Sequence, residues 1–357
     1  MGVFFALLFI PIIIQHTAIK NHYVSYEKKN RRALAFFFLL LTVLVMFRHE
    51  TIGNDTSNYM SYYEIFSNLS WSETGKVSME RGFAYLNKFL SLFSKEPQFF
   101  IAASAVTVST MIYPTYKRLC LDSFLTIVLF CLMSTFVMMF SGVRQMLAVA
   151  IGFIAYEFTR NRKTIPFVLT VFLAMAFHSS AFMLFFMYPI YHAKITKKWI
   201  FLVVPAIATV FVFNEPIFTL LLFIMERYTR FSGEISPTGA YTMIILFVVF
   251  AIFSFLIPDE SKLDKETIGL RNFLLFSVII QLFAPLHTIA MRMNYYYIIF
   301  IPLLIPKIIE ARSNRWNQVA KVARHVMAVF FLVYFFYNAY TAENNLNVFP
   351  YKFFWET

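Results

Sequence analysis

Charged residues of both signs stand at the ends of long apolar segments in this chain. An arginine offers up to five N–H donors to an anion, and a carboxylate accepts hydrogen bonds and protons. Charges at membrane depth are costly and usually face a cavity, a partner or the interface. Under the topology derived below, those outside the basic loop clusters fall on one side: Arg48, Glu50, Asp55, Glu80, Arg81, Arg144, Arg227 and Arg292. We therefore expect one site there that holds an anion and offers a carboxylate.

Two of these charges belong to short polar motifs. Gly53 lies among the polar residues of segment 48–56, where it permits a tight turn whose backbone N–H groups can meet a ligand. Arg144 and Gln145 stand at the start of an apolar segment that follows Ser141 and Gly142, at a helix N-terminus suited to an anion. The residues alone also allow purely structural interpretations. Arg48 could snorkel from an interfacial loop, and Arg144 could be a simple interface anchor.

Three further groups are candidates on weaker grounds. His178 begins a polar stretch, residues 178–180, between two short apolar segments, and its imidazole could orient a hydroxyl group or transfer a proton. A structural histidine that tightens a helical hairpin fits equally well. Arg292 precedes three consecutive tyrosines, and segment 349–354 is mostly aromatic, but aromatic belts are common at membrane interfaces and need no function.

The composition sets the class of protein. Apolar residues make up 59% of the 357 residues even without glycine, and charged residues only 14%; soluble domains average about 45–50% and about 25%. Too few polar side chains remain to cover a soluble protein, which excludes soluble, disordered and collagen-like classes. The net charge of +12 comes from short basic clusters between apolar runs, which indicates membrane topology and not nucleic-acid binding.

Several catalytic patterns are absent from the sequence. It contains neither a Walker-type phosphate loop nor the His-Glu-x-x-His and Gly-x-Ser-x-Gly motifs, and no Cys or His pairs at metal-ligand spacing. ATP-driven transport, zinc proteolysis and serine hydrolysis therefore have no support. We expect no metal and no cofactor.

Apolar run lengths predict an all-α integral membrane protein, a single polytopic domain over 1–357 with about 12 transmembrane helices. A helix needs roughly 20 apolar residues to cross the bilayer. The expected spans lie near residues 2–19, 33–48, 98–114, 122–140, 143–159, 164–178, 179–193, 199–213, 240–257, 270–290, 293–309 and 323–340. The stretch 164–193 could also be one span, in which case every later loop changes side.

The basic residues orient these spans. With the N-terminus outside, the inner loops hold 21 of the 31 Lys and Arg residues and the outer segments hold 10, in agreement with the positive-inside rule. One long outer loop covers about 48–98, and within it the stretch Tyr59–Leu69 carries apolar residues at helical spacing. A second outer loop, 214–239, contains an apolar stretch, Pro216–Met225, too short to cross and so expected to be re-entrant or interfacial.

Five motifs in order along the chain resemble one family. They are Arg48-x4-Gly53-x-Asp55-x3-Tyr59, Glu80-x-Gly82-Phe83, Gly142-x-Arg144-Gln145-x2-Ala148, His178-Ser179-Ser180-Ala181 and Pro350-Tyr351-Lys352-Phe353-Phe354. Their succession is similar to the EpsG-like branch of the bacterial Wzy-type polysaccharide polymerases. Family members often have Thr before the loop aspartate, where this chain has Asn54, a departure that concerns sugar contacts more than mechanism.

The resemblance implies a GT-C-like glycosyltransferase of the bacterial inner membrane whose site faces the periplasm or exterior. Such an enzyme joins oligosaccharide repeat units carried on undecaprenyl pyrophosphate into O-antigen, capsule or exopolysaccharide. Donor and acceptor are both lipid-linked glycans, and a chain-length regulator is a possible partner alongside membrane lipid. Neither a nucleotide sugar nor a metal is expected. A single displacement inverts the anomeric carbon, although a double displacement stays open.

The resemblance also distributes roles over the candidate residues. Four cations would neutralise the leaving pyrophosphate: Arg48, Arg144, Arg292 and Arg227. The acceptor hydroxyl needs a proton acceptor, for which the candidates are Asp55, Glu80, Glu50 and His178, the first two preferred because they belong to the matched motifs. Sugar contacts would come from Asn54, Tyr59, Gln145, Tyr351 and Lys352.

Three other functions compete with a polymerase. A glycan ligase would use the same cationic site for the same leaving group. A membrane sugar O-acyltransferase would use His178, but the sequence offers no convincing acyl-CoA site. A flippase or transporter of lipid-linked oligosaccharide should show internal repeats or charges distributed through its spans. Here the charges gather on one side, which favours chemistry over transport.

Overall fold

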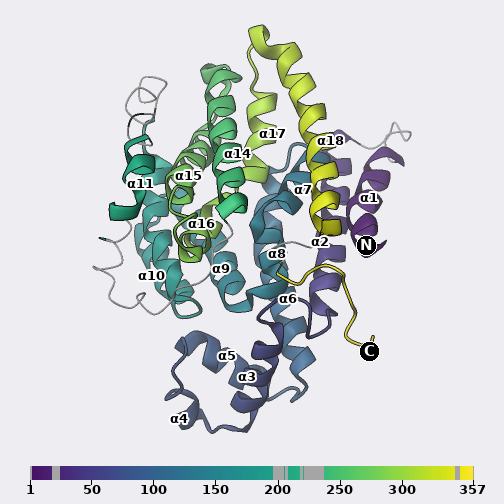
Figure 1. The fold of residues 1–357 in the computed structure, drawn as a ribbon, viewed down its shortest axis with the longest axis vertical. Helices are drawn as coiled ribbons and strands as arrows, with labels where there is room; N and C mark the ends of the chain where they lie inside the picture. Colours follow the sequence, from purple (N-terminus) through teal and green to yellow (C-terminus); the bar gives the residue numbers. More distant parts are fainter. Residues whose placement is uncertain are drawn as a thin grey trace. The chain divides into compact units, whose positions relative to one another are not determined.

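The computed structural model describes residues 2–17, 25–195, 205, 208–217, 220, 237–341 and 346–356, and structural statements below refer to these residues. The second expected outer loop, its short helix after Pro216 and the expected span 199–213 lie largely outside them. The described chain is built from helices (Figure 1). The all-α class expected from the composition is confirmed.

The chain divides into two compact units, Met1–Phe185 with Val322–Thr357, and Phe186–Lys321. We describe each unit by itself, and a single membrane domain stays a prediction. The first unit contains α1 Gly2–Thr17, α2 Tyr26–Met46, α3 Thr56–Asn68, α4 Trp71–Thr74, α5 Arg81–Leu90, α6 Pro97–Leu119, α7 Ser123–Leu132, α8 Ser134–Ser141, α9 Val143–Arg160, α10 Thr164–Met175 and most of the 3-10 helix η2 Ser179–Phe186. Most of α18, Asn317–Thr341, belongs to this unit as well.

Helix packing in the first unit follows the chain order closely. Helix α2 packs against α1 and α6, α6 packs against α9, and α9 packs against α10. The long loop between α2 and α6 forms α3, α4 and α5, which gather beside the N-terminal end of α6 (Figure 1). Helix α3 covers most of the predicted amphipathic stretch and buries Tyr59, Tyr63 and Phe66. The sequence therefore predicted this helix and its packing face correctly.

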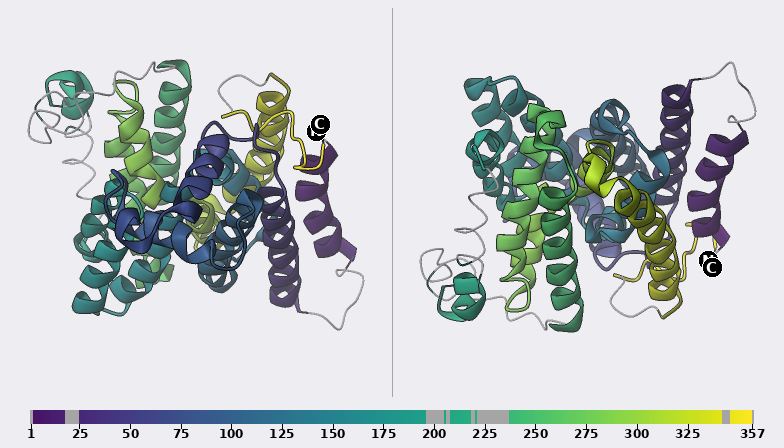
Figure 2. Two further views of the ribbon diagram at one scale, coloured as in Figure 1. Left: turned by 90° about the horizontal axis from the view of Figure 1, so that it is seen from below. Right: turned by 90° about the horizontal axis from the view of Figure 1, so that it is seen from above.

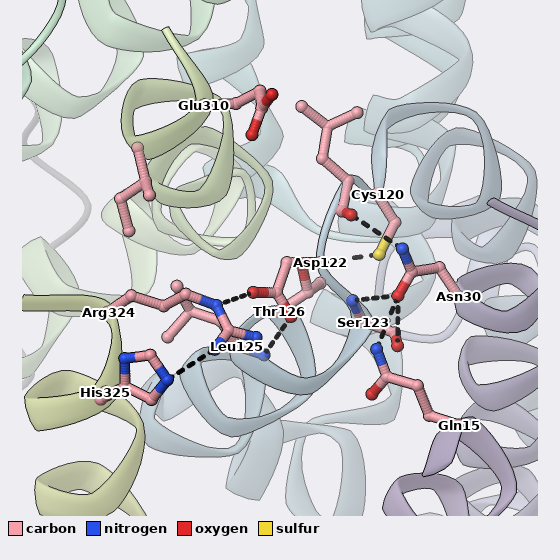
Figure 3. A network of polar contacts seen from close by, with 12 residues as sticks. Gln15, Asn30, Cys120, Asp122, Ser123, Leu125, Thr126, Glu310, Arg324 and His325 are labelled. Carbon is pink, nitrogen blue, oxygen red and sulfur yellow. Dashed lines mark hydrogen bonds and ion pairs between the residues drawn. The ribbon is translucent and has the colours of Figure 1, made fainter. Parts of the chain in front are cut away.

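A polar network ties four helices of the first unit together (Figure 3). The Asn30 amide on α2 donates to the Leu121 carbonyl at 2.8 Å and accepts from Gln15 on α1 at 2.9 Å. The Ser123 hydroxyl at the start of α7 donates to the same amide oxygen at 2.9 Å. Asp122, the N-cap of α7, pairs with Arg324 of α18. Buried polar groups need partners, and here each satisfies another.

The second unit contains α11 Met187–His192, α14 Pro237–Leu256, η4 Glu260–Lys262, α15 Lys265–Gln281, α16 Thr288–Ile298, α17 Ile301–Glu310, η5 Asn314–Trp316 and the first residues of α18. Helix α15 lies between α11, α14 and α16, and Figure 2 shows α14 and α15 side by side in both views. Arg271 on α15 is buried, pairs with Glu260 at 2.8 Å and stacks on the Phe255 ring.

Few of these helices are long enough to cross a membrane by themselves. Within the described residues two qualify by length and composition, Pro97–Leu119 and Asn314–Thr341. Two bent pairs raise the number to four if each pair is one span: α7 with α8, bent by 65°, and α16 with α17, bent by 47°. The spans expected over 122–140 and 293–309 are therefore each divided into two helices with a bend between them, and a bundle of about 12 crossings stays a prediction.

The breaks have local causes. Met133 between α7 and α8 has an extended backbone (φ −68°, ψ 140°), which averaged hydropathy does not reveal because both flanking helices are mostly apolar. The doubtful stretch 164–193 is interrupted near His178, between the 12-residue α10 and the 3-10 helix η2. At about 1.5 Å per residue, α10 is only about 18 Å long, well short of the hydrocarbon thickness.

Candidate functional site

An ion pair between Arg144 and Glu80 forms the centre of the site. Arg144 is the second residue of α9, two positions after the N-cap Gly142, and Glu80 is the N-cap of α5. The Arg144 Nη1 donates to Glu80 Oε2 at 2.7 Å, and the two side chains are 28% and 21% exposed. The pair is thus partly open to a ligand. Residues 64 positions apart in the sequence meet at the ends of two helices.

Aromatic rings enclose the Arg144 guanidinium. Its central carbon lies 5.9 Å from the centre of the Tyr59 ring and 5.7 Å from that of Phe83. A guanidinium near an aromatic face gains a cation–π attraction, which limits the directions in which it can move. Burial raises the pKa of Tyr59, while the nearby Arg144 lowers it. The phenol therefore stays neutral at ordinary pH and presents a hydroxyl group to the site.

The same carboxylate reaches the loop that carries His178. The Ser179 backbone N–H donates to Glu80 Oε1 at 3.4 Å, so the two oxygens of Glu80 face different segments. The Ser180 backbone N–H donates to His178 Nδ1 at 3.3 Å, and the Ser180 hydroxyl lies 2.7 Å from that nitrogen. Because Nδ1 accepts a hydrogen bond, we assign the proton of the neutral ring to Nε2.

A close contact explains the glycine in the second motif. The Phe83 N–H donates to the Ala176 carbonyl at 3.3 Å, which joins the start of α5 to the end of α10. A Cβ on Gly82 would lie 2.7 Å from the same carbonyl oxygen. Only glycine allows this approach without a shift. The approach brings Glu80 to the loop after α10.

Arg48 lies in different surroundings. Its side chain is fully buried, with Nη1 donating to the Val45 carbonyl at 2.6 Å and Nε to the Thr56 hydroxyl at 3.2 Å. Within the described part of the chain no ion pair involves it, and its Nη2 has no hydrogen-bond partner. Arg48 also lines a small hollow with Ser104 and Met139, large enough for about one water molecule. Arg48 is therefore buried and does not take part in the partly exposed ion pair.

The loop after Arg48 packs on the C-terminal end of α8, just before α9. Gly53 has a φ of +85°, and a Cβ there would lie 2.2 Å from the Phe140 carbonyl oxygen. Thr56 Oγ1 lies 3.1 Å from the same oxygen and 2.6 Å from the Ile52 carbonyl. Thr56 was not among the residues expected from the sequence. It could have been found from its position, three residues after Gly53 and at the start of α3. These contacts hold the backbone just before Arg144.

The C-terminal segment closes over this loop. The His49 N–H donates to the Lys352 carbonyl at 3.0 Å, and the Tyr351 hydroxyl donates to the Leu44 carbonyl at 2.7 Å. Burial raises the pKa of Tyr351, which the neighbouring Arg48 partly offsets. The Lys352 side chain is exposed. The fifth motif therefore lies against the first, although about 300 residues separate them.

The remaining candidate residues differ in burial and in position. Asp55 is the half-buried N-cap of α3, and its charge contributes to the raised pKa of Tyr59. Gln145 is buried on α9 beside Arg144. Glu50 and Asn54 are exposed in the same loop. Arg292 is exposed on α16 in the second unit, and Arg227 lies outside the described residues, so neither can be related to this site.

A metal centre is not among the described features. In the ranges that the structure covers, no three His, Cys, Asp or Glu residues come together in a way that could hold a metal ion. The candidate site consists of one partly exposed ion pair, a neutral phenol and an imidazole. These groups can bind an anion, accept a proton and orient a hydroxyl group.

The apolar helices define a polytopic, all-helical membrane protein. A family model narrows the class: the model of the EpsG family matches residues 31–353, and the chain belongs to that family. The match spans the Glu80–Arg144 pair, the His178 loop and most of the C-terminal segment. Family membership indicates a polymerase of the glycosyltransferase type in polysaccharide biosynthesis. Neither the curated proteins nor the solved structures contain a match to this chain.

Proposed function

We propose that the protein joins undecaprenyl-pyrophosphate-linked oligosaccharide repeat units into a surface polysaccharide at the outer leaflet of the bacterial inner membrane. The observation that carries this proposal is the Glu80–Arg144 ion pair, which places a cation and a carboxylate side by side at a partly exposed position. Glycosyl transfer from a pyrophosphate needs both groups, one for the leaving group and one for the acceptor proton.

The proposed reaction begins with an exchange of partners. A pyrophosphate oxygen of the donor displaces the Glu80 carboxylate from Arg144, whose guanidinium then neutralises the charge that develops on the leaving group. Partly exposed ion pairs contribute only about 0–1 kcal/mol, so this exchange costs little. The displaced carboxylate is then free to accept a proton.

The bond changes follow from this arrangement. The acceptor hydroxyl oxygen attacks the anomeric carbon of the donor sugar while its proton passes to Glu80. The bond between the anomeric carbon and the pyrophosphate oxygen breaks, and undecaprenyl pyrophosphate leaves with that electron pair. One glycosidic bond forms with inversion at the anomeric carbon. His178 and Tyr59 orient hydroxyl groups, and the exposed Asn54 and Lys352 are proposed sugar contacts.

Arg48 and Arg144 have different surroundings, which supports different roles for the two residues. Arg48 was expected to bind pyrophosphate, but its buried side chain bonds to Val45 and Thr56. We propose that it acts as a positioning residue for the loop that supports Arg144. Arg292 and Arg227 stay predictions as further pyrophosphate ligands.

Deletion of the gene in its host tests the function. We expect surface glycan of single repeat units, with those units accumulating on the lipid carrier at the outer leaflet, and restoration by the wild-type gene. Units trapped at the inner leaflet would instead indicate a flippase. Full-length glycan lacking one substituent would indicate an acyltransferase, and finished glycan retained on the carrier a ligase.

Complementation with point variants tests the chemistry. Glu80→Gln keeps the shape of the side chain but removes the proton acceptor, so we expect polymer to fall by about 10²–10⁴-fold. Asp55→Asn, the same change at the second carboxylate of the motifs, should retain far more polymer. Glu157→Gln is the matched control, because Glu157 pairs with Arg118 at 2.6 Å in the same unit with similar exposure. A Glu80→Gln variant with normal chain length would refute the assignment of the base.

A further inference from the structure

The outer loop exposes a continuous set of apolar side chains on and beside α5. We call Trp71, Tyr85, Phe89, Leu92 and Phe93 the outer aromatic face. Trp71 stacks on Tyr85 with 6.2 Å between ring centres, and Phe89 meets Phe93 edge-on at 5.4 Å. All five side chains are exposed, Leu92 by 62% and Phe93 by 68%.

This face is not the side on which α5 packs into the protein. Helix α5 already buries Phe83, Ala84 and Asn87 against the rest of the first unit. It is therefore apolar on two sides, a pattern that indicates contact with an apolar environment on both. Contiguous exposed apolar patches of this kind mark surfaces that bind protein or membrane.

The continuation of the chain indicates which of these two covers the face. Phe93 stands four residues before Pro97, the first residue of α6, and α6 is one of the helices long and apolar enough to span a membrane. Exposed apolar residues continue along α6 at Phe99 and Val106. The outer aromatic face is thus continuous in sequence with a candidate membrane-spanning helix that itself carries exposed apolar side chains.

The residue types around the face agree with a lipid interface. Trp and Tyr concentrate at the head-group level of membranes, where an apolar ring and a polar tip are both accommodated. Two lysines flank the aromatic residues: Lys95 is exposed, and Lys88 reaches the Ser67 carbonyl at 3.2 Å. Lysines beside aromatic residues are typical of helices that lie in the plane of the interface.

We propose that the outer aromatic face lies in the head-group region of the lipid bilayer and holds α5 flat against it. Because Glu80 is the N-cap of α5, this contact fixes the depth of the Glu80–Arg144 pair. If the proposed function holds, that depth is where the pyrophosphate of a lipid-linked donor lies. The lipid contact itself rests only on the exposed residues and their continuity with α6.

Spin-label accessibility in the full-length protein tests the contact. The protein is placed in nanodiscs of phosphatidylethanolamine and phosphatidylglycerol, with Cys120→Ser and Cys131→Ala to remove the native thiols. A label at Phe93→Cys should collide with oxygen several-fold more, relative to a water-soluble nickel chelate, than a label at Ser57→Cys. Ser57 is the matched control, an exposed polar residue on α3 of the same loop.

The outcomes separate the candidate environments. Equal nickel access at positions 93 and 57 would show that water covers the face and would overturn the proposal. An immobilised label shielded from both reagents would show that protein covers it, with the same consequence. Leu92→Cys provides a second reporter if the first variant folds poorly. Because the readout does not depend on polymer, it stands or falls separately from the proposed glycosyl transfer.

Discussion

Arg48 and Arg144 look alike in the sequence, but the structure gives them opposite surroundings. Each lies at the end of an apolar segment and within a motif of the family. The Arg48 side chain is fully buried and bonds to a carbonyl three residues back and to a hydroxyl eight residues ahead. The Arg144 side chain is 28% exposed and pairs with a carboxylate from another helix. Residue type and motif position therefore do not decide which arginine can meet a ligand.

The difference in environment implies a difference in energy. A buried donor or acceptor that is left without its hydrogen bond costs about 1–3 kcal/mol, and more when the group is charged, which is the situation of Arg48. A partly exposed ion pair such as Glu80–Arg144 contributes at most about 1 kcal/mol and can be exchanged. Arg48 thus suits a fixed structural task, and Arg144 suits a role in which a ligand replaces its partner.

Among the predictions that test this comparison, the largest expected effect is the loss of polymer in Arg144→Ala. We expect Arg144→Ala to reduce polymer by about 10²–10³-fold or more, because it removes the cation that stabilises the leaving group. The measurement is the size distribution of surface glycan in the complemented deletion strain, normalised to the amount of protein in the membrane. Arg118→Ala, at an ion pair of comparable exposure, should leave the distribution unchanged. An equal loss of polymer in both variants would show that Arg144 has no special role in the reaction.

The next effect is on folding at Gly53. A valine there must adopt the left-handed backbone and place its Cβ against the Phe140 carbonyl. The backbone term alone is about 1–2 kcal/mol, and the overlap adds to it. We expect a lower Tm in detergent and less folded protein. Gly2→Val is the control, because a Cβ at Gly2 meets nothing within 4 Å; similar melting of both variants would contradict the packing described here.

Arg48→Met tests the positioning role. The variant loses the hydrogen bonds to Val45 and Thr56 but also removes a buried charge, so we expect a loss of roughly 1–3 kcal/mol in stability. Polymer per folded protein should stay within tenfold of the wild type, unlike in Arg144→Ala. The two variants are compared in one assay, with folded protein counted by size-exclusion chromatography. If Arg48→Met abolishes polymer while folding normally, Arg48 takes part in the chemistry.

The smallest effect concerns the tyrosine beside Arg48. Tyr351→Phe removes the hydrogen bond to the Leu44 carbonyl and should cost about 1 kcal/mol. Because burial raises the pKa of Tyr351, its stabilising contribution is complete below the ordinary value near 10. It is lost as the pH rises through the higher folded pKa. Ultraviolet titration of phenolate should therefore lose a late-titrating step in Tyr351→Phe, and the loss of a step near pH 10 instead would contradict the burial.

The sequence predicted the parts of this protein that depend on local composition. Apolar runs predicted an all-helical membrane protein, and period-3.6 spacing predicted the helix that became α3 with Tyr59 on its buried face. The breaks between α7 and α8 and between α16 and α17 were not predictable in this way. Hydropathy averages over a window, and an extended residue such as Met133 is hidden when both flanking helices are mostly apolar.

For the site, the sequence named candidate motifs but could not assign partners within them. Glu80, Arg144 and His178 were candidates because charged and titratable residues in an apolar chain are costly and so call for an explanation. Only the folded chain shows that one carboxylate joins Arg144 and Ser179, that Arg48 turns inward, and that the Lys352 carbonyl meets His49. Whether a side chain is exposed or paired depends on segments that lie far apart in the chain. The packing of α5, α9 and α10 brings these segments together.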